Sequence, residues 1–253
     1  MTVTRRRRIL HRVALAAVVL LVVGIAAFLW WARPQALLPE ATAALASTSG
    51  ATFQQGPGGR LIFTGTAAAP DTGLVLYTGG KVEPAAYAPA ARAIAEAGYL
   101  VVIVPAPLNF AIFDTGAAAP VIADHPEIAA WAVGGHSLGG ASAALFIDGN
   151  PGVVDGLALW ASFSSADIAD ERLEVALVYG SLDGGAAGFT SPDALTSLGD
   201  DVTVTVIEGG NHEQMGWYTG QPNDPQATLT REAQQAMLVD ATIALLGAID
   251  PTP

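Results

Sequence analysis

The sequence predicts an α/β fold, a mostly parallel sheet flanked by helices, preceded by one transmembrane helix. Three observations lead to this prediction. A long uncharged apolar stretch follows a cluster of arginines near the N-terminus. Beyond it, short apolar runs alternate with helical stretches, which is the pattern of a parallel sheet wrapped by helices. Several of these runs are apolar throughout, as in strands that are covered on both faces.

The composition limits the classes of protein to which the chain can belong. It has 253 residues, 51% of them hydrophobic and 13% charged, which fits one folded domain with a short appendage. It has no cysteine, which excludes disulfides, thiolate nucleophiles and cysteine-ligated metals. The net charge of −12 argues against binding to nucleic acid. We expect no cofactor and no metal, and the oligomeric state does not follow from the sequence.

Basic and acidic residues are unevenly distributed. Five of the eleven basic residues are arginines that precede residue 13, whereas all 23 acidic residues follow from Glu40 onward. From residue 34 to the end there are 5 basic and 23 acidic residues, a formal charge of −18.

The apolar stretch covers residues 13–32 and is long enough to cross a membrane. Twenty residues at 1.5 Å each span about 30 Å, the thickness of a hydrocarbon core. Trp30 and Trp31 stand where indole rings favour the interface, and the arginines favour the cytoplasmic side. We therefore predict a cytoplasmic head at 1–12, a signal-anchor at 13–32, a tether at 33–57 and an extracytoplasmic domain at 58–253.

A cleaved signal peptide is the alternative to an anchor. Two Ala-x-Ala patterns follow the stretch, at 41–43 and 44–46. However, the stretch exceeds the 7–15 apolar residues of a typical signal, and both patterns lie about ten residues beyond Trp31. The anchor is therefore favoured, with secretion after cleavage left as the alternative.

The first half of the domain holds four predicted strands and one helix. The apolar runs 61–63 and 74–77 predict strands, as do the continuously apolar 99–104 and the shorter 131–133. Between them, residues 84–97 carry apolar side chains at helical spacing, opened by Pro84 and closed by Gly98.

The second half continues the alternation. A Gly-rich turn leads into a helix that runs to about Ile147, and residues 157–160, 175–179 and 202–207 predict strands. A short helix is expected at 193–198. A long amphipathic helix is expected at 230–246, with Thr230 available as its cap.

Residues Gly135-His136-Ser137-Leu138-Gly139 match the pattern G-x-S-x-G. The pentapeptide follows an apolar strand and opens a helix of small residues, which is the setting of a nucleophile elbow. Glycines at both ends let helix and strand approach closely while Ser137 takes a strained backbone geometry. The alternative is an ordinary Gly-rich turn.

A serine hydroxyl needs a base, usually an imidazole. Of the four histidines, His11 lies in the head, His125 in a surface loop, and His136 inside the elbow, where it cannot easily turn back onto the neighbouring hydroxyl. His212 follows the last predicted strand and is therefore the candidate base, although a structural loop histidine is the simpler alternative.

Asp183 is the candidate partner of His212, because it follows the strand at 175–179 and gives the order Ser, Asp, His along the chain. Asp155 and Asp167 are rivals, one before its strand and one in a polar connection. A turn aspartate before glycine is the simpler reading of Asp183.

An acyl-transfer site also needs donors to the developing oxyanion. The backbone N–H of Leu138 is the first candidate, because it stands at the start of the elbow helix. The loop after the strand at 74–77 supplies the others, the amides of Gly79, Gly80 and Lys81. Lys81 is the only lysine, and its side chain is read more simply as a solvated loop charge.

Six segments carry a resemblance to a known family: 76–82, 86–89, 98–105, 107–110, 135–140 and 209–216. Through them, residues 72–248 resemble the α/β-hydrolase superfamily and, more narrowly, its small lidless dienelactone-hydrolase-like branch. The resemblance implies a Ser137–His212–Asp183 triad and hydrolysis of an ester or related acyl bond.

Two departures from that branch refine the expectation. Ser137 replaces the cysteine nucleophile of dienelactone hydrolases, which puts that substrate in doubt. About ten residues, 166–174, separate two strands where larger relatives insert a cap, so no cap domain and an open site are expected. Six residues on nearby loops and strand ends are candidates to line the pocket for a small acyl substrate, with ordinary packing as the alternative for each: Pro107, Asn109, Phe110, Trp160, Met215 and Trp217.

Two alternatives to a hydrolase remain open at this point. The chain could be a non-catalytic envelope protein that keeps the fold and binds a ligand. It could also be an acyltransferase that uses the same triad with an alcohol in place of water.

Overall fold

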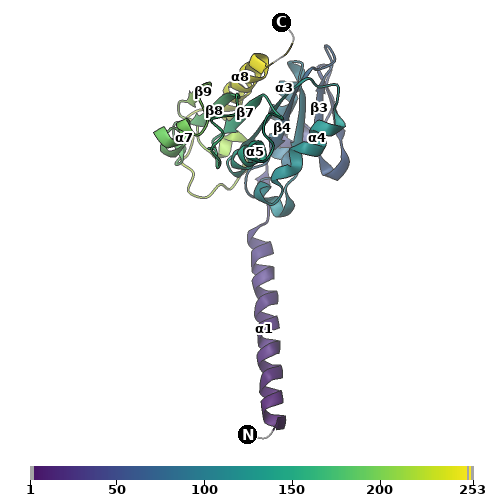
Figure 1. The fold of residues 1–253 in the computed structure, drawn as a ribbon, viewed down its shortest axis with the longest axis vertical. Coiled ribbons are helices and arrows are strands. Elements are labelled where there is room, and N and C mark those ends of the chain that lie inside the picture. Colours follow the sequence, from purple (N-terminus) through teal and green to yellow (C-terminus); the bar gives the residue numbers. More distant parts are fainter. Residues whose placement is uncertain (1–2, 250, 252–253) are drawn as a thin grey trace. The chain divides into compact units, whose positions relative to one another are not determined.

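The computed structural model describes residues 3–249 and 251, and it divides into two compact units at the boundary between Arg33 and Pro34 (Figure 1). The first two residues of the predicted head, and residues 250, 252 and 253 of the predicted domain, lie outside the described residues.

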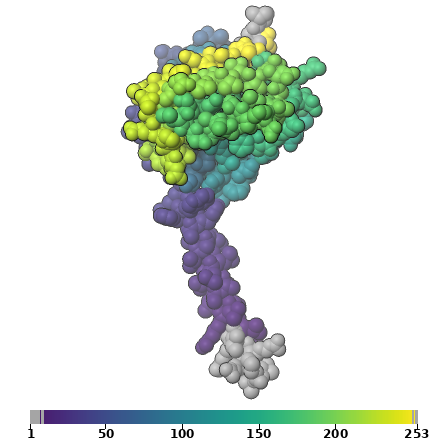
Figure 2. All heavy atoms as spheres, turned by 90° about the vertical axis from the view of Figure 1, so that its left-hand side faces the viewer, coloured from purple at the N-terminus to yellow at the C-terminus, as the bar shows by residue number. Residues whose placement is uncertain are grey.

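The first unit is a single helix, α1 (Val3–Trp31). Its stretch Leu10–Trp31 is 22 residues long, and by length and apolar composition it could cross a membrane. The large apolar side chains of this stretch are exposed all along the helix, for example Leu20 at 72% and Trp30 at 67% (Figure 2). At 1.5 Å per residue it measures about 33 Å, enough for a hydrocarbon core.

The second unit is built on an eight-stranded mixed sheet, which confirms the predicted fold class. Its spatial order is β2-β3-β5-β4-β6-β7-β8-β9. The two strands at one edge, β2 and β3, run antiparallel, and the strands from β5 to β9 are parallel. The strands are β2 (Ala51–Gln55), β3 (Leu61–Gly65), β4 (Thr72–Tyr77), β5 (Leu100–Val104), β6 (Ala130–His136), β7 (Gly156–Trp160), β8 (Glu174–Gly180) and β9 (Val202–Ile207).

Helices cover both faces of this sheet (Figure 1). Helices α3 (Ala88–Glu96) and α8 (Arg231–Ile249) pack against each other on one face, where α3 contacts β3 and β5 and α8 contacts β7 and β8. Figure 2 shows α8, in yellow, beside the green segments around β8 and β9. On the other face, α5 (Leu138–Gly149) contacts β4, β6 and β7. Shorter helices are α4 (Ala118–Asp124), α6 (Ala186–Phe189) and α7 (Pro192–Thr196).

Short 3₁₀ turns complete the connections. They are η1 (Pro57–Gly59), η2 (Pro84–Tyr87), η3 (Pro107–Asn109), η4 (Ala111–Phe113), η5 (Thr115–Ala117) and η6 (Glu213–Met215).

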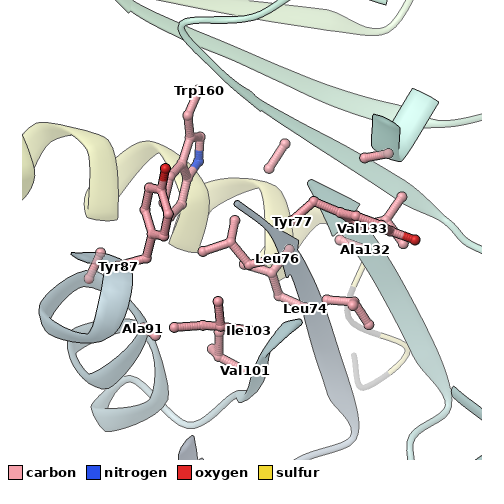
Figure 3. Close-up of a cluster of buried hydrophobic side chains, with 14 of the residues drawn as sticks. Leu74, Leu76, Tyr77, Tyr87, Ala91, Val101, Ile103, Ala132, Val133 and Trp160 are labelled. Carbon is pink, nitrogen blue, oxygen red and sulfur yellow. The ribbon is translucent and has the colours of Figure 1, made fainter. Parts of the chain in front are cut away.

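The core between the sheet and α3 is formed by fully buried aliphatic side chains (Figure 3). Leu74 and Leu76 of β4 and Ile103 of β5 face Ala91 of α3. This burial fixes which face of each central strand turns toward α3 and α8. Because the parallel strands all run the same way, their carboxyl ends meet at one edge of the sheet.

The segment 33–57, which we expected to be a tether, differs from that expectation. Residues Ala36–Leu37 form β1 and pair with β10 (Tyr218–Thr219), Pro39–Ala43 form the helix α2, and β2 extends the main sheet beyond β3. The small side chains of Ala41 and Ala44 are fully buried. Backbone pairing and close packing of alanines therefore place this low-charge stretch inside the folded body.

Candidate active site

Ser137 connects β6 to α5 in a strained backbone conformation. Its φ of 53° and ψ of −121° lie in a region that non-glycine residues rarely adopt. Such a conformation costs about 1–3 kcal/mol and persists only where the surrounding structure enforces it. Ser137 therefore has the sharp strand-to-helix geometry that the G-x-S-x-G pattern predicts.

The glycines that flank Ser137 allow β6 and α5 to approach closely. A Cβ on Gly139 would overlap the carbonyl oxygen of Tyr77 and lie 2.8 Å from that of Thr78. A Cβ on Gly135 would lie 2.7 Å from the backbone nitrogen of Gly140. These neighbours are backbone atoms, which cannot move aside independently, so only glycine fits at both positions.

Asp183 and His212 meet at the carboxyl edge of the sheet. Asp183 follows β8 and His212 follows β9, and these two strands are parallel neighbours. The carboxylate Oδ2 of Asp183 lies 2.7 Å from Nδ1 of His212, and the two side chains are 4% and 15% exposed. The other oxygen, Oδ1, accepts the N–H of Gly185 at 2.8 Å. The carboxylate is thus held at both oxygens, and Nδ1 of the imidazole is engaged.

The loop that carries His212 is held by two side chains that the sequence analysis did not identify. Gln234 of α8 is fully buried and bonds the backbone of Asn211 twice, accepting its N–H at 3.1 Å and donating to its carbonyl at 2.7 Å. Asp224 accepts the N–H groups of His212 at 3.2 Å and Glu213 at 2.7 Å. Partial burial is the main cause that raises the pKa of Asp224 above its ordinary value. These contacts fix the backbone on both sides of the imidazole.

Ser137, Asp183 and His212 line one cavity of about 480 Å³, together with Leu138. In the described part of the chain, neither the Ser137 hydroxyl nor Nε2 of His212 takes part in a hydrogen bond. Contacts between a nucleophile and its base often tighten only when substrate binds. Among the described residues, neither atom therefore has a competing partner. The remaining lining residues are Ala141, Ala161, Ser162, Phe163, Gly184, Gly185, Phe189, Gln221, Pro222, Asn223 and Asp224.

The amides proposed as oxyanion donors are not all available. The N–H of Gly79 donates to the hydroxyl of Tyr87 at 2.9 Å, and that of Lys81 donates to the carbonyl of Asn109 at 2.7 Å. Leu138 is the first residue of α5, where an N–H has no acceptor within the helix. A Cβ on Gly80 would lie 3.6 Å from Cδ2 of Leu138, so the two residues are neighbours. The expectation for Gly79 and Lys81 is therefore corrected, and the remaining pair is Leu138 with Gly80.

The side chains expected to line the pocket lie elsewhere. Trp160 and Met215 are fully buried, and Nε1 of Trp160 donates to Thr242 of α8 at 3.1 Å. Trp217 lines a separate depression of about 340 Å³ beside residues of α3 and α8. The reason is the direction of each side chain, which closeness in sequence does not reveal; for Trp160, the last residue of β7, strand register sets that direction. The expected lining residues outside the cavity of Ser137 are Pro107, Asn109, Phe110, Trp160, Met215 and Trp217.

A buried pair next to the elbow was also missed. The hydroxyl of Tyr87, which accepts the N–H of Gly79, lies 2.9 Å from Nδ1 of His136. The rings of His136 and His212 are 4.5 Å apart. Burial, followed by the nearby charge of His212, lowers the pKa of His136 well below its ordinary value, so this imidazole is neutral. Tyr87 and His136 thus connect the Gly79 loop to the neighbourhood of His212.

Comparison with known proteins gives one family. Residues 73–236 match the family described as the alpha/beta hydrolase family. No curated protein matches the chain.

Proposed function

The chain belongs to the alpha/beta hydrolase family, and on this premise we propose that it is a serine hydrolase that cleaves an ester or related acyl bond. The observation that carries the proposal is that Ser137, Asp183 and His212 line one cavity, with Asp183 hydrogen bonded to His212 at 2.7 Å. The strained backbone of Ser137 gives further support, because strain of this kind is retained where a reactive side chain must be presented.

The proposed reaction has two halves. Oγ of Ser137 attacks the acyl carbon while Nε2 of His212 takes the hydroxyl proton, and Asp183 stabilises the resulting imidazolium through Nδ1. The N–H groups of Leu138 and Gly80 bind the oxyanion, each contributing about 2.7–4 kcal/mol to transition-state stabilisation. The imidazolium then protonates the leaving alcohol. Water, deprotonated by His212, then attacks the acyl carbon, and the imidazolium returns the proton to Oγ of Ser137 as the bond to the acyl group breaks and the acid leaves.

The shape of the site favours substrates that do not need a deep enclosed chamber. Residues 161–173, which join β7 to β8, contain neither helix nor strand in the described chain. A cap inserted there would cover the cavity, and this chain has only a short connection. We therefore propose an open site that accepts short or projecting acyl groups.

We further propose that α1 anchors the enzyme to the cell membrane, with the body on the extracytoplasmic side. Support comes from the 22-residue apolar stretch Leu10–Trp31 and from the arginines that precede it, which favour the cytoplasmic side. Full-length protein is expected to stay in the membrane fraction after alkaline carbonate washing with an intact N-terminus. Recovery of a soluble form that begins near residue 44 or 47 would contradict the anchor and indicate a cleaved signal peptide.

The test of the enzymatic proposal is hydrolysis of a panel of chromogenic acyl esters by the full-length chain and by Ser137→Ala. We expect turnover by the wild type and loss of turnover in the variant. Parallel reactions with added alcohol acceptors measure transfer to an acceptor against release of free acid. A folded wild type that consumes no ester under either condition contradicts the proposal and favours a binding protein.

A further inference from the structure

One loop of the body exposes large apolar side chains. Within six residues, Leu108 is 48% exposed, Ile112 41% and Phe113 59%. The segment 105–113, here called the apolar loop, contains no charged residue, although the chain from residue 34 onward carries all 23 acidic residues. A concentrated apolar patch on an otherwise acidic surface marks a place of contact with an apolar partner.

Part of the backbone of the apolar loop is hydrogen bonded within the loop itself. The N–H of Asn109 donates to Ala106 at 3.0 Å, that of Phe110 to Pro107 at 3.0 Å, and that of Phe113 to Phe110 at 3.1 Å. A backbone polar group without a partner is costly in contact with hydrocarbon. For these three N–H groups, contact with a lipid surface does not carry that cost.

The apolar loop also lies next to the point where the body begins. The N–H of Gln35 donates to the carbonyl of Lys81 at 2.8 Å, and the N–H of Lys81 donates to the carbonyl of Asn109 at 2.7 Å. Gln35 follows Trp31, the last residue of the candidate span, by only four residues. Four extended residues reach about 14 Å at most. If that span is anchored in a membrane, only a short stretch of chain separates it from the hydrogen bond between Gln35 and Lys81.

We propose that the apolar loop rests on the lipid surface of the membrane that holds the anchor, and that the substrate is an ester carried in that lipid phase. This inference rests on the proposed hydrolase and its anchor. The apolar loop borders the proposed oxyanion loop, because a Cβ on Gly80 would lie 3.6 Å from the ring of Phe110. A lipid-borne ester would therefore meet the body close to Gly80 and Leu138.

The absence of cysteine from the chain allows a direct measurement of lipid contact. Full-length Phe113→Cys and the control Val153→Cys would each be labelled with an environment-sensitive thiol dye and reconstituted into phosphatidylcholine–phosphatidylglycerol vesicles. Val153 is 43% exposed and precedes the amino end of β7, whereas the apolar loop follows the carboxyl end of β5. Phosphatidylcholine with a nitroxide on its acyl chain should quench the dye at 113 several-fold more than the dye at 153.

Equal quenching at the two positions overturns the inference, as does cross-linking between two Phe113→Cys chains without lipid quenching, which indicates a second copy as the partner. If Phe113→Cys does not fold, Ile112→Cys takes its place. This readout needs no activity, so it is separate from the test of the hydrolase.

A second measurement addresses the substrate. The double variant Ile112→Ser/Phe113→Ser should hydrolyse a vesicle-borne ester several-fold more slowly than the wild type and a soluble short-chain ester at the same rate. Equal losses on both esters overturn the inference, because the loop then shapes the catalytic site itself. A wild type that is inactive on every ester contradicts the proposed function. The quenching experiment then still decides whether the apolar loop contacts lipid, because it does not depend on activity.

Discussion

The carboxylate of Asp183 and the imidazole of His212 form a hydrogen bond of 2.7 Å between side chains 29 residues apart in the chain. Asp183 is almost fully buried, and its second oxygen is held by the N–H of Gly185. This arrangement fixes both the orientation of the imidazole and the position of its proton, because a carboxylate at Nδ1 keeps the proton on that nitrogen. Nε2 is then the nitrogen that can accept a proton.

Asp183→Asn should abolish most activity and leave the fold intact. The amide can donate to Nδ1 and so favours the wrong imidazole tautomer, an effect that lowers kcat by about 10⁴-fold in a triad of this kind. The measurement is kcat on a chromogenic ester, with circular dichroism to verify folding. Asp201→Asn is the control, because Asp201 is exposed and precedes β9, away from the cavity. Similar activity in the two variants removes Asp183 from the mechanism.

The two ends of α5 offer a matched test of the elbow. Gly139→Ala should destabilise the protein by about 1–3 kcal/mol or more, because the new Cβ meets the carbonyl oxygens of Tyr77 and Thr78. Gly149→Ala, at the last residue of the same helix, meets nothing within 4 Å and should be neutral or stabilising by up to about 1 kcal/mol. Urea denaturation measures both, and equal free energies of unfolding would show that the close approach at Gly139 is not required.

Tyr87→Phe should lower both stability and kcat. The change leaves the N–H of Gly79 and Nδ1 of His136 buried without a partner, at about 1–3 kcal/mol for each group. The change also frees the backbone of Gly79, which precedes the proposed oxyanion donor Gly80. We therefore expect kcat to fall by about tenfold, equivalent to about 1.4 kcal/mol, with a smaller change in KM.

Tyr77→Phe is the control for this loss of hydrogen bonds. The hydroxyl of Tyr77 also accepts one backbone N–H, from Ala118, and donates to a carbonyl, that of Thr115. Its loss should cost similar stability with little effect on kcat. Equal losses of kcat in the two variants would mean that Tyr87 acts through stability alone.

His136 should make stability depend on pH below the ordinary histidine pKa of 6.5. Its folded pKa is lowered by burial, so in this range the unfolded chain binds a proton that the folded chain does not. Stability is therefore present above pH 6.5 and declines as pH falls toward the folded pKa, at about 1.4 kcal/mol per pH unit for one proton. In His136→Asn this component should disappear from denaturation curves taken across that range. An unchanged slope would assign the pH dependence to other groups.

The sequence was sufficient to predict the central strands of the sheet, because they are continuous apolar runs: those at 99–104 and 157–160 correspond to β5 and β7. Residues 202–207, in which Val and Thr alternate, were also predicted as a strand and form the edge strand β9 with those bounds. The strands β1, in the separate two-stranded sheet, and β2, at one end of the main sheet, were not predicted, for a physical reason. The two-residue strand β1 exists only through its pairing with β10, more than 180 residues away, and β2 is mostly polar or exposed.

The candidate triad could be selected from residue type and chain order, whereas its supports could not. Gln234 and Asp224 act on the His212 loop through backbone hydrogen bonds that depend on how α8 and the segment before it fold back. Trp160 illustrates the opposite error, since it stands at a strand end near the site but turns its ring toward α8. Residue spacing indicates which strand end a side chain occupies and says little about the face toward which it points.

The most direct test of the central claim is the mass of the adduct that a fluorophosphonate forms with the full-length protein. A serine that is activated by His212 and Asp183 should bond to phosphorus with loss of fluoride, and peptide mapping should place the added mass on Ser137. His212→Ala, folded but without the base, should react far more slowly. A folded wild type that stays unmodified, or an adduct on any other residue, contradicts the assignment of Ser137 as the nucleophile.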